Sequence, residues 1–159
     1  MREGYDVAQI CLNGHVITAM AGHVPERTRN FCEDCGAATI TECPSCDQSI
    51  PGFYLNSAVV GSLYEPPAFC GDCGKPYPWT GRRLEAAREL ALEAGSLSSD
   101  ERGQLIASFD DLTRDTPRTQ VAVGRFKRLA AKAGVETASA LRAVLVDVMS
   151  EAAKKAIWG

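Results

Sequence analysis

Residues 31–36 read FCEDCG and residues 69–74 read FCGDCG, so the same short pattern occurs twice in the chain. In both copies, two residues separate a pair of cysteines and a glycine follows the second cysteine. Two thiolates at this spacing fit into one tight turn, and the glycine lets the chain bend sharply after it. A third such pair, Cys43 and Cys46, occurs in CPSC, where Pro44 restricts the backbone. The pattern is typical of a metal-binding turn, here called a knuckle.

The seventh cysteine completes a set of metal ligands. Cys11 has no second cysteine nearby, but His15 follows it in the string CLNGH. Four pairs supply eight ligands, enough for two tetrahedral structural zinc ions. His23 is an alternative to His15, although the eleven residues between it and Cys11 are too many for one turn. The predicted ligands are Cys11, His15, Cys32 and Cys35 for the first zinc ion, and Cys43, Cys46, Cys70 and Cys73 for the second.

Two schemes can group these four pairs. In a sequential scheme the first pair joins the second and the third joins the fourth, whereas in a cross-brace, as in RING-like domains, the pairs alternate. The repeat favours the sequential scheme, because each ribbon then opens with its own knuckle and closes with F-C-x-D-C-G. Sixteen residues separate His15 from Cys32 and 23 separate Cys46 from Cys70, near the usual spacing of a zinc ribbon.

Several strings together resemble a known family. They are YDVAQICLNGH, FCEDCG, CPSC and FCGDCGKPYPWT, followed by the region around DLTRDTPRT. Along nearly the whole chain they look like an uncharacterised bacterial family of double zinc-ribbon proteins with a helical C-terminal region. The resemblance implies zinc binding and a bacterial cytosolic setting, and it supplies no activity.

The composition of the chain changes near residue 80. Residues 1–80 are rich in Cys, Gly, Pro and β-branched residues, and all seven cysteines lie there. Short strand-like runs occur at 16–20 (VITAM), 37–40 (AATI) and 58–60 (AVV). We therefore expect an α+β protein: a small double zinc ribbon of short antiparallel strands, then a bundle of about four helices in 81–159. The first metal site is expected within about 1–40 and the second within about 41–80.

Residues typical of helix caps predict where the four helices begin. The first is expected over about 81–94, with Thr80 as its N-cap. The second follows Ser98, which can form a capping box with Glu101. The third begins at Pro117, and the fourth runs from Thr137 nearly to the end. The third is expected to bury Val121, Phe126, Leu129 and Ala133, and the fourth carries the stripe Leu141, Val144, Leu145, Val148 and Ala152.

The cysteines and the hydropathy pattern suggest a compartment. Seven cysteines, an odd number, argue against a pure disulfide framework and favour metal binding in a reducing environment. The first ten residues contain no apolar signal region, and no run approaches the roughly 20 apolar residues of a membrane span. We expect a cytoplasmic protein without a membrane span.

Catalysis is not expected. If protein side chains fill all eight positions, both zinc ions lack the open position that a catalytic zinc keeps for water. The sequence contains no G-x-S-x-G, Walker A or H-E-x-x-H motif. A zinc-dependent hydrolase is the less favoured alternative, and it requires that His15 is not a ligand.

Charge and exposed side chains indicate what the protein binds. Residues 1–80 carry a net charge of −5 and residues 81–159 carry +2. An acidic ribbon region is a poor match for phosphates. The third helix, by contrast, has a basic stripe of Arg125, Arg128 and Lys132, which is either a solvated face or a nucleic-acid contact.

Aromatic residues are candidates for protein contact. Tyr77 and Trp79 follow the last knuckle and are possible interaction anchors, although Trp79 could instead pack the ribbon against the first helix. Ile157 and Trp158 keep the last helix apolar to its end, which suggests bundle core or self-association. We expect a non-enzymatic zinc-binding scaffold or adaptor with a protein partner or self-association; the alternative is a nucleic-acid-binding regulator that uses the third helix.

Overall fold

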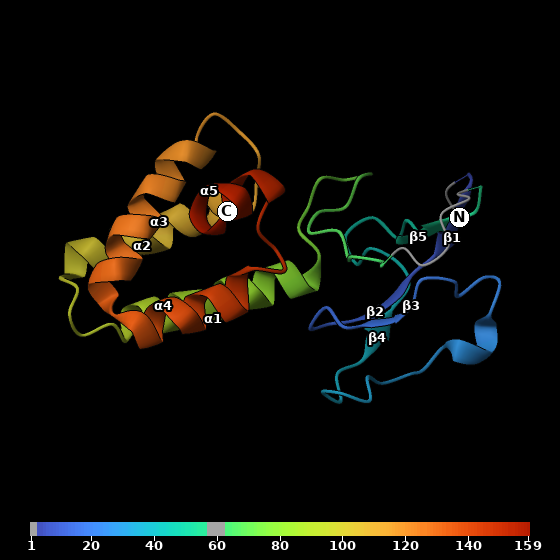
Figure 1. Ribbon diagram of the computed structural model, residues 1–159. Helices are drawn as coiled ribbons and strands as arrows, with labels where there is room; N and C mark the ends of the chain where they lie inside the picture. The colour runs from blue at the N-terminus through green and yellow to red at the C-terminus, as the bar shows by residue number, and fades with distance from the viewer. Residues whose placement is uncertain (1–2, 57–62) are drawn as a thin grey trace. The chain divides into compact units, whose positions relative to one another are not determined.

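The computed structural model describes residues 3–56 and 63–159, and it divides into two compact units, Met1–Gly81 and Arg82–Gly159 (Figure 1). Short antiparallel strands form the first unit and helices form the second, which confirms the predicted α+β fold class. The strand expected at residues 58–60 lies outside the described residues. Within the described ranges, every helix falls short of the length or hydrophobicity that a bilayer crossing requires.

Two small sheets make up the first unit. The elements are β1 (Tyr5–Val7), β2 (Gln9–Cys11), β3 (Val16–Thr18), a 3-10 helix (Pro25–Arg27), β4 (Thr39–Ile40) and β5 (Pro51–Tyr54). In one sheet β1 pairs with β5, and in the other β2 lies between β3 and β4. All of these pairs are antiparallel.

The two ribbons are interlaced rather than placed one after the other. β1 and β2 are neighbours in sequence, yet they belong to different sheets. β1 pairs with β5, which lies between the two knuckles of the second predicted site, and the Ala8 N–H donates to the Ile50 carbonyl at 2.9 Å. The Phe53 N–H donates to the Ala19 carbonyl at 3.0 Å, and a Cβ at Gly52 would collide with that carbonyl oxygen. The strand β5 of the second ribbon therefore pairs with the start of the chain, whereas the sheet that carries Cys11 lies within residues 9–40.

A buried carboxylate holds the start of the chain. Asp6 is 1% exposed. Its carboxylate accepts hydrogen bonds from the N–H groups of Val7 (2.7 Å) and Gly22 (2.8 Å) and from Nδ1 of His23 (2.8 Å). Burial favours the neutral acid, but these hydrogen bonds outweigh it and lower the pKa of Asp6 below its ordinary value of 3.8. Asp6 therefore joins β1 to the loop that carries His23.

Five helices follow. They are α1 (Pro78–Leu92), α2 (Ser99–Leu112), α3 (Thr119–Ala133), α4 (Val135–Leu145) and α5 (Glu151–Trp158). α1 begins at Pro78, a favoured first helical position, and not after Thr80. The hydroxyl of Thr80 is no cap, because it donates to the Ala68 carbonyl at 2.8 Å. α3 begins two residues after Pro117.

The capping box predicted for α2 is present. The Ser98 hydroxyl accepts from the Glu101 N–H at 3.2 Å, and the Glu101 carboxylate accepts from the Ser98 N–H at 3.0 Å. The helix predicted from Thr137 to the end is instead two helices, α4 and α5, of which α4 begins directly after Gly134. Ser150 is the N-cap of α5, and its N–H donates to the Leu112 carbonyl at 3.0 Å. This tertiary hydrogen bond and cap interrupt the continuous helix that the apolar spacing suggested.

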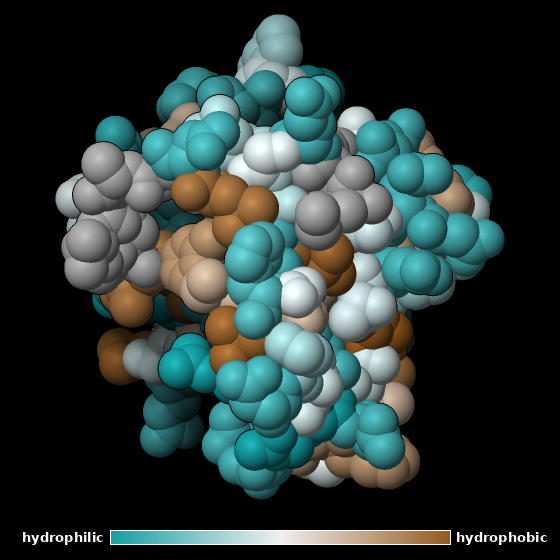
Figure 2. All heavy atoms as spheres, turned by 90° about the vertical axis from the view of Figure 1, so that its right-hand side faces the viewer, coloured by the Kyte–Doolittle hydropathy of each residue, from teal (hydrophilic) through white to brown (hydrophobic). Residues whose placement is uncertain are grey.

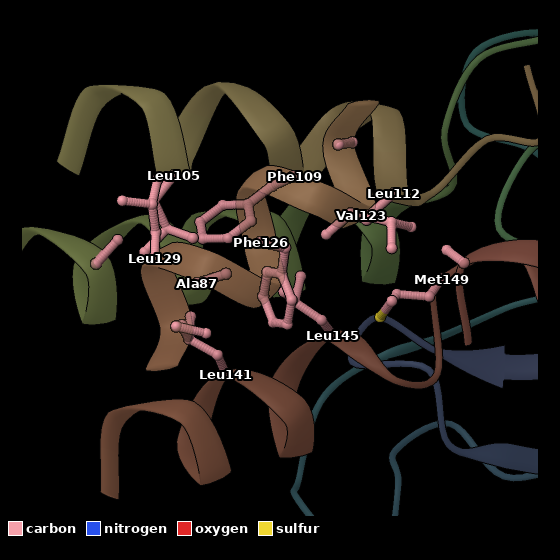
Figure 3. Close-up of a cluster of buried hydrophobic side chains, with 14 of the residues drawn as sticks. Ala87, Leu105, Phe109, Leu112, Val123, Phe126, Leu129, Leu141, Leu145 and Met149 are labelled. Carbon is pink, nitrogen blue, oxygen red and sulfur yellow. The ribbon is translucent and has the colours of Figure 1, made fainter. Parts of the chain in front are cut away.

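All five helices contribute to one hydrophobic core (Figure 3). Phe109 of α2 and Phe126 of α3 lie at its centre, among leucines of α2, α3 and α4. The expectation that α3 buries Val121 is wrong: Val121 is exposed, and Ala122 and Val123 face the core instead. Trp158 packs edge-on against Phe126, with ring centroids 6.3 Å apart, so the apolar end of α5 belongs to the bundle.

We predict that Asp6→Asn lowers the free energy of unfolding of the first unit by about 1–3 kcal/mol at pH 7, because the amide nitrogen would face hydrogen-bond donors. A group with a lowered folded-state pKa stabilises the fold above its unfolded pKa. The difference between the two proteins should therefore be present above the unfolded pKa, 3.8, and be lost as the pH falls through the lower folded-state pKa.

Chemical unfolding at several pH values measures this difference, and comparing the two proteins cancels the effect of acid on the thiols that they share. Glu65→Gln, an exposed carboxyl of the same unit, is the control and should change stability by less than about 0.5 kcal/mol. Equal stability of the wild-type protein and the Asp6→Asn variant at pH 7 would show that the carboxylate does not hold β1 in place.

Candidate metal centres

The structure gathers the eight predicted ligands into two groups of four. One group contains Cys11, His15, Cys32 and Cys35, and the other contains Cys43, Cys46, Cys70 and Cys73. Within each group the ligand atoms all lie within 4.8 Å of one another. The grouping is the sequential one and not the cross-brace. His23 is in neither group, because its Nδ1 is hydrogen-bonded to Asp6.

The distances between ligand atoms match the edges of a metal tetrahedron. Sulfur–sulfur distances are 3.8 Å for Cys11–Cys35, 3.8 Å for Cys43–Cys73 and 3.7 Å for Cys46–Cys70. Four sulfurs placed 2.3 Å from a central ion would be about 3.8 Å apart. All seven cysteines are free, and a disulfide would bring two sulfurs to about 2 Å. Each group is therefore shaped to hold one ion.

The imidazole fits the same geometry. Nδ1 of His15 lies 3.4 Å from the sulfur of Cys11 and 3.6 Å from that of Cys32. Tetrahedral bonds of about 2.3 Å to sulfur and 2.0–2.1 Å to nitrogen give a separation of about 3.5 Å. His15 is thus placed as the fourth ligand of the first site through Nδ1.

Three of the four knuckles have the same backbone. The N–H of the first cysteine donates to the carbonyl five residues later, and its own carbonyl accepts from the N–H four residues later. These bonds join Cys32 to Ala37 and Gly36, Cys43 to Gln48 and Asp47, and Cys70 to Lys75 and Gly74, all at 2.8–2.9 Å. The residue after the second cysteine has a left-handed φ in each: 74° at Gly36, 61° at Asp47 and 76° at Gly74. Asp47 thus takes the place of the glycine in CPSC.

The fourth knuckle is the tip of the β2–β3 hairpin. The Cys11 N–H donates to the His15 carbonyl at 2.9 Å, and the His15 N–H lies 3.3 Å from the Cys11 sulfur. Gly14, with a φ of 95°, makes this turn possible. The hairpin therefore presents a thiol and an imidazole to the same point.

Hydrogen bonds favour the thiolate form of two ligands, Cys35 and Cys70. Asn13 Nδ2 donates to Cys35 at 3.4 Å and lowers the pKa of that thiol to about 6. Burial raises the pKa of Cys11, opposed by the N–H groups of His15 and Asn13. Burial also opposes ionisation of Cys70, but the N–H groups of Cys73 and Asp72, the Cys46 thiol and Tyr77 outweigh it and lower that pKa to about 6. At Cys46 the Gln48 N–H favours the thiolate, but burial and the neighbouring thiols outweigh it and raise that pKa to about 12. Anionic sulfur is the form that binds a metal.

Sequence reasoning missed two residues that lower these pKa values. Asn13 lies inside the string CLNGH, and Tyr77 follows Cys73 by four residues, so their positions in the motifs were the available signal. The sequence predicts Tyr77 and Trp79 as possible contact residues, with packing as the alternative for Trp79. They are 1% and 2% exposed, so they belong to the interior of the first unit and form no open contact surface.

The basic residues of α3 are partly engaged within the helical unit. Lys132 forms an ion pair with Glu101 at 2.7 Å and lowers the pKa of that carboxyl to about 2. Arg128 donates to the side chain of Gln104 at 3.3 Å. Arg125 and Arg128 line a shallow groove of about 640 Å³ between α2 and α3. The stripe is therefore partly a network of intramolecular contacts.

Comparison with known proteins gives the family. Residues 4–157 match the model of a family described as "Uncharacterized protein conserved in bacteria (DUF2321)". No curated protein and no solved structure matches the chain. The match covers almost the whole chain, and it agrees with the resemblance to an uncharacterised bacterial family. The protein therefore belongs to this bacterial family, DUF2321.

Proposed function

We propose that both sites bind Zn²⁺ and that the ion is structural. The single observation that supports this most strongly is the set of ligand distances, which match a tetrahedron of sulfur and nitrogen donors. Thiolate-rich tetrahedral sites favour zinc over hard ions such as Mg²⁺ and Ca²⁺. The ion would neutralise thiolates at the centre of each ribbon, and the seven free cysteines suit a reducing cytoplasm.

Closed coordination favours a structural role over catalysis. Each group supplies four protein ligands, so a tetrahedral ion would keep no position for water or substrate. The hydrolase alternative requires that His15 is not a ligand, but its imidazole lies among the ligand atoms of the first site. We therefore propose a non-enzymatic protein.

The surface beside the first site supports protein binding. A cavity of about 290 Å³ is lined by the apolar side chains Val16 and Ile17 and by Arg27 and Arg29. Phe31, directly before the ligand Cys32, is 63% exposed. Figure 2 shows hydrophobic side chains interspersed with hydrophilic ones at the surface of the molecule. An exposed aromatic ring next to a rigid metal turn is a suitable anchor for another protein.

The internal repeat strengthens this interpretation. Phe69 stands in the same place as Phe31, directly before the first cysteine of its knuckle, and both residues form an isolated bridge across that knuckle. Phe69 is half-buried, whereas Phe31 is exposed. The phenylalanine before the knuckle therefore packs against the protein in the second ribbon and is exposed to solvent in the first. We propose that the protein is a zinc-held scaffold or adaptor that binds a protein partner, or a second copy, at this surface.

Nucleic-acid binding through α3 is the second candidate. The groove lined by Arg125 and Arg128 favours it. Against it, Lys132 and Arg118 are held in ion pairs with Glu101 and Asp111. Seven thiolates around two divalent ions would also add a net charge of −3 to a region that already carries −5. The protein scaffold is therefore the better-supported proposal.

We predict two zinc ions per chain in native mass spectrometry of the full-length protein, purified without chelator from zinc-replete cells. Cys46→Ser should lower the zinc content and destabilise the first unit, because structural zinc sites contribute of order 10 kcal/mol to folding. Ser45→Ala, between the same two ligands, is the control and should keep both ions. A well-folded wild-type protein without zinc would refute the metal proposal.

We also predict that a photo-crosslinking amino acid at position 31 forms a defined protein adduct in living cells, whereas the same amino acid at position 135 does not. Val135 is a matched control, because it is a highly exposed apolar residue of the helical unit. Electrophoresis and mass spectrometry distinguish a dimer of this chain from another protein. The absence of a protein adduct at position 31 in the zinc-loaded protein would contradict the scaffold proposal, and adducts to nucleic acid would favour the second candidate.

A further inference from the structure

A stacked aromatic pair lies between the two metal sites of the first unit. The rings of Tyr77 and Trp79 are 4.7 Å apart at an interplanar angle of 17°, and both side chains are buried. The Tyr77 N–H donates to the Ala68 carbonyl, two residues before Cys70, and the Tyr77 side chain helps to lower the pKa of the Cys70 thiol, a ligand of the second site. One end of the pair is therefore joined to the knuckle of the second metal site.

The other end of the pair packs against the first metal site. A Cβ placed on Gly14 would lie 3.0 Å from the Cβ of Trp79 and 3.3 Å from the first atom of its ring. Gly14 belongs to the hairpin tip that carries Cys11 and His15. The absence of a side chain at Gly14 thus lets Trp79 lie against the backbone of the first knuckle.

Three hydrogen bonds fix the segment that carries the pair. Trp79 Nε1 donates to the Pro67 carbonyl at 2.9 Å, and the Thr80 hydroxyl donates to the Ala68 carbonyl at 2.8 Å. The Tyr77 N–H also donates to the Ala68 carbonyl, at 3.0 Å. Residues 67 and 68 lead directly into the knuckle of Cys70. The position of Trp79 therefore depends on the closure of the loop between residues 67 and 80, which the second metal site would hold.

We infer that the two metal sites are coupled through the Tyr77–Trp79 pair, so that metal at the second site raises the affinity of the first. Loss of the second ion frees the Cys70 knuckle, the loop of residues 67–80 loosens, and Trp79 no longer supports the Cys11–His15 hairpin. Coupling of this kind is reciprocal, so metal at the first site strengthens the second equally. The inference rests on the proposed function, because it requires that both sites bind metal.

Cadmium-113 NMR of the full-length protein tests the coupling, because a four-sulfur site and a three-sulfur, one-nitrogen site give separate resonances. The protein is loaded with ¹¹³Cd²⁺ and titrated with a chelator. In the wild-type protein we expect both resonances to disappear together. Tyr77→Phe keeps the stacked ring and removes the hydroxyl, so its direct effect is confined to the second site. Residues next to a metal ligand commonly contribute tenfold or more to metal affinity.

If the sites are coupled, Tyr77→Phe moves the common chelator midpoint of both resonances by about threefold, including that of the first site, where no contact has changed, because a tenfold loss at one site is shared between two ions that leave together. Tyr64→Phe is the control: its hydroxyl is bonded to the Pro51 carbonyl at 2.6 Å in the same unit, and the variant should leave both affinities unchanged. In Trp79→Ala, the chelator should empty the two sites at different concentrations.

The outcomes separate the two proposals. A wild-type protein that binds no ¹¹³Cd²⁺ refutes the metal sites themselves. Two resonances that disappear independently, with Tyr77→Phe affecting the four-sulfur resonance alone, would overturn the coupling and leave the proposed metal sites intact. Joint loss in the wild type, joint weakening in Tyr77→Phe and separate loss in Trp79→Ala would establish it.

Discussion

The proposed coordination of metal by thiolates is the constraint on which the first unit would depend. Among the described residues of that unit, the large buried apolar side chains other than cysteine are Ile10, Ile50, Tyr77 and Trp79. So small a core cannot offset the entropy of ordering about eighty residues that consist mostly of loops. Two metal sites of four ligands each can offset this entropy, because each ion contributes of order 10 kcal/mol to folding. The helical unit differs, because its five helices share a continuous apolar core that needs no metal.

This constraint explains why the two ribbons are interlaced. Strands of two to four residues cannot form stable sheets alone, so β1 pairs with β5 and β2 pairs with β4 across segments that the metal sites hold in place. Asp6 and the Tyr77–Trp79 pair add buried hydrogen bonds and packing at the same joints. On the proposed function, the two metal sites would hold the ribbon unit together, and its open surface around Phe31 and the cavity beside β3 would receive the partner.

Local signals in the sequence were sufficient for the ligand groups and for the presence of a helical C-terminal half, although not for all of its helix boundaries. The repeated F-C-x-D-C-G string and the CLNGH string indicated the sequential grouping that the structure has, and Ser98 with Glu101 placed the start of α2. The predictions that were wrong concern features fixed by contacts between residues that are distant in the sequence. The break before α5 is fixed by a hydrogen bond from Ser150 to Leu112, and strands as short as β1 carry no readable periodicity. The sequence offered packing of Trp79 as an alternative to a contact role, but it could not show that Trp79 lies against Gly14, some sixty residues away.

Amide hydrogen exchange of the zinc-loaded and the metal-free full-length protein tests the central claim most directly. If metal coordination holds the first unit together, removing the metal will abolish protection in β2, in the four knuckles and in residues 77–80, while the amides of α2 and α3 keep theirs. Continued protection of β2 and the knuckles in metal-free protein would contradict the claim, and would mean that side-chain packing alone supports the ribbons.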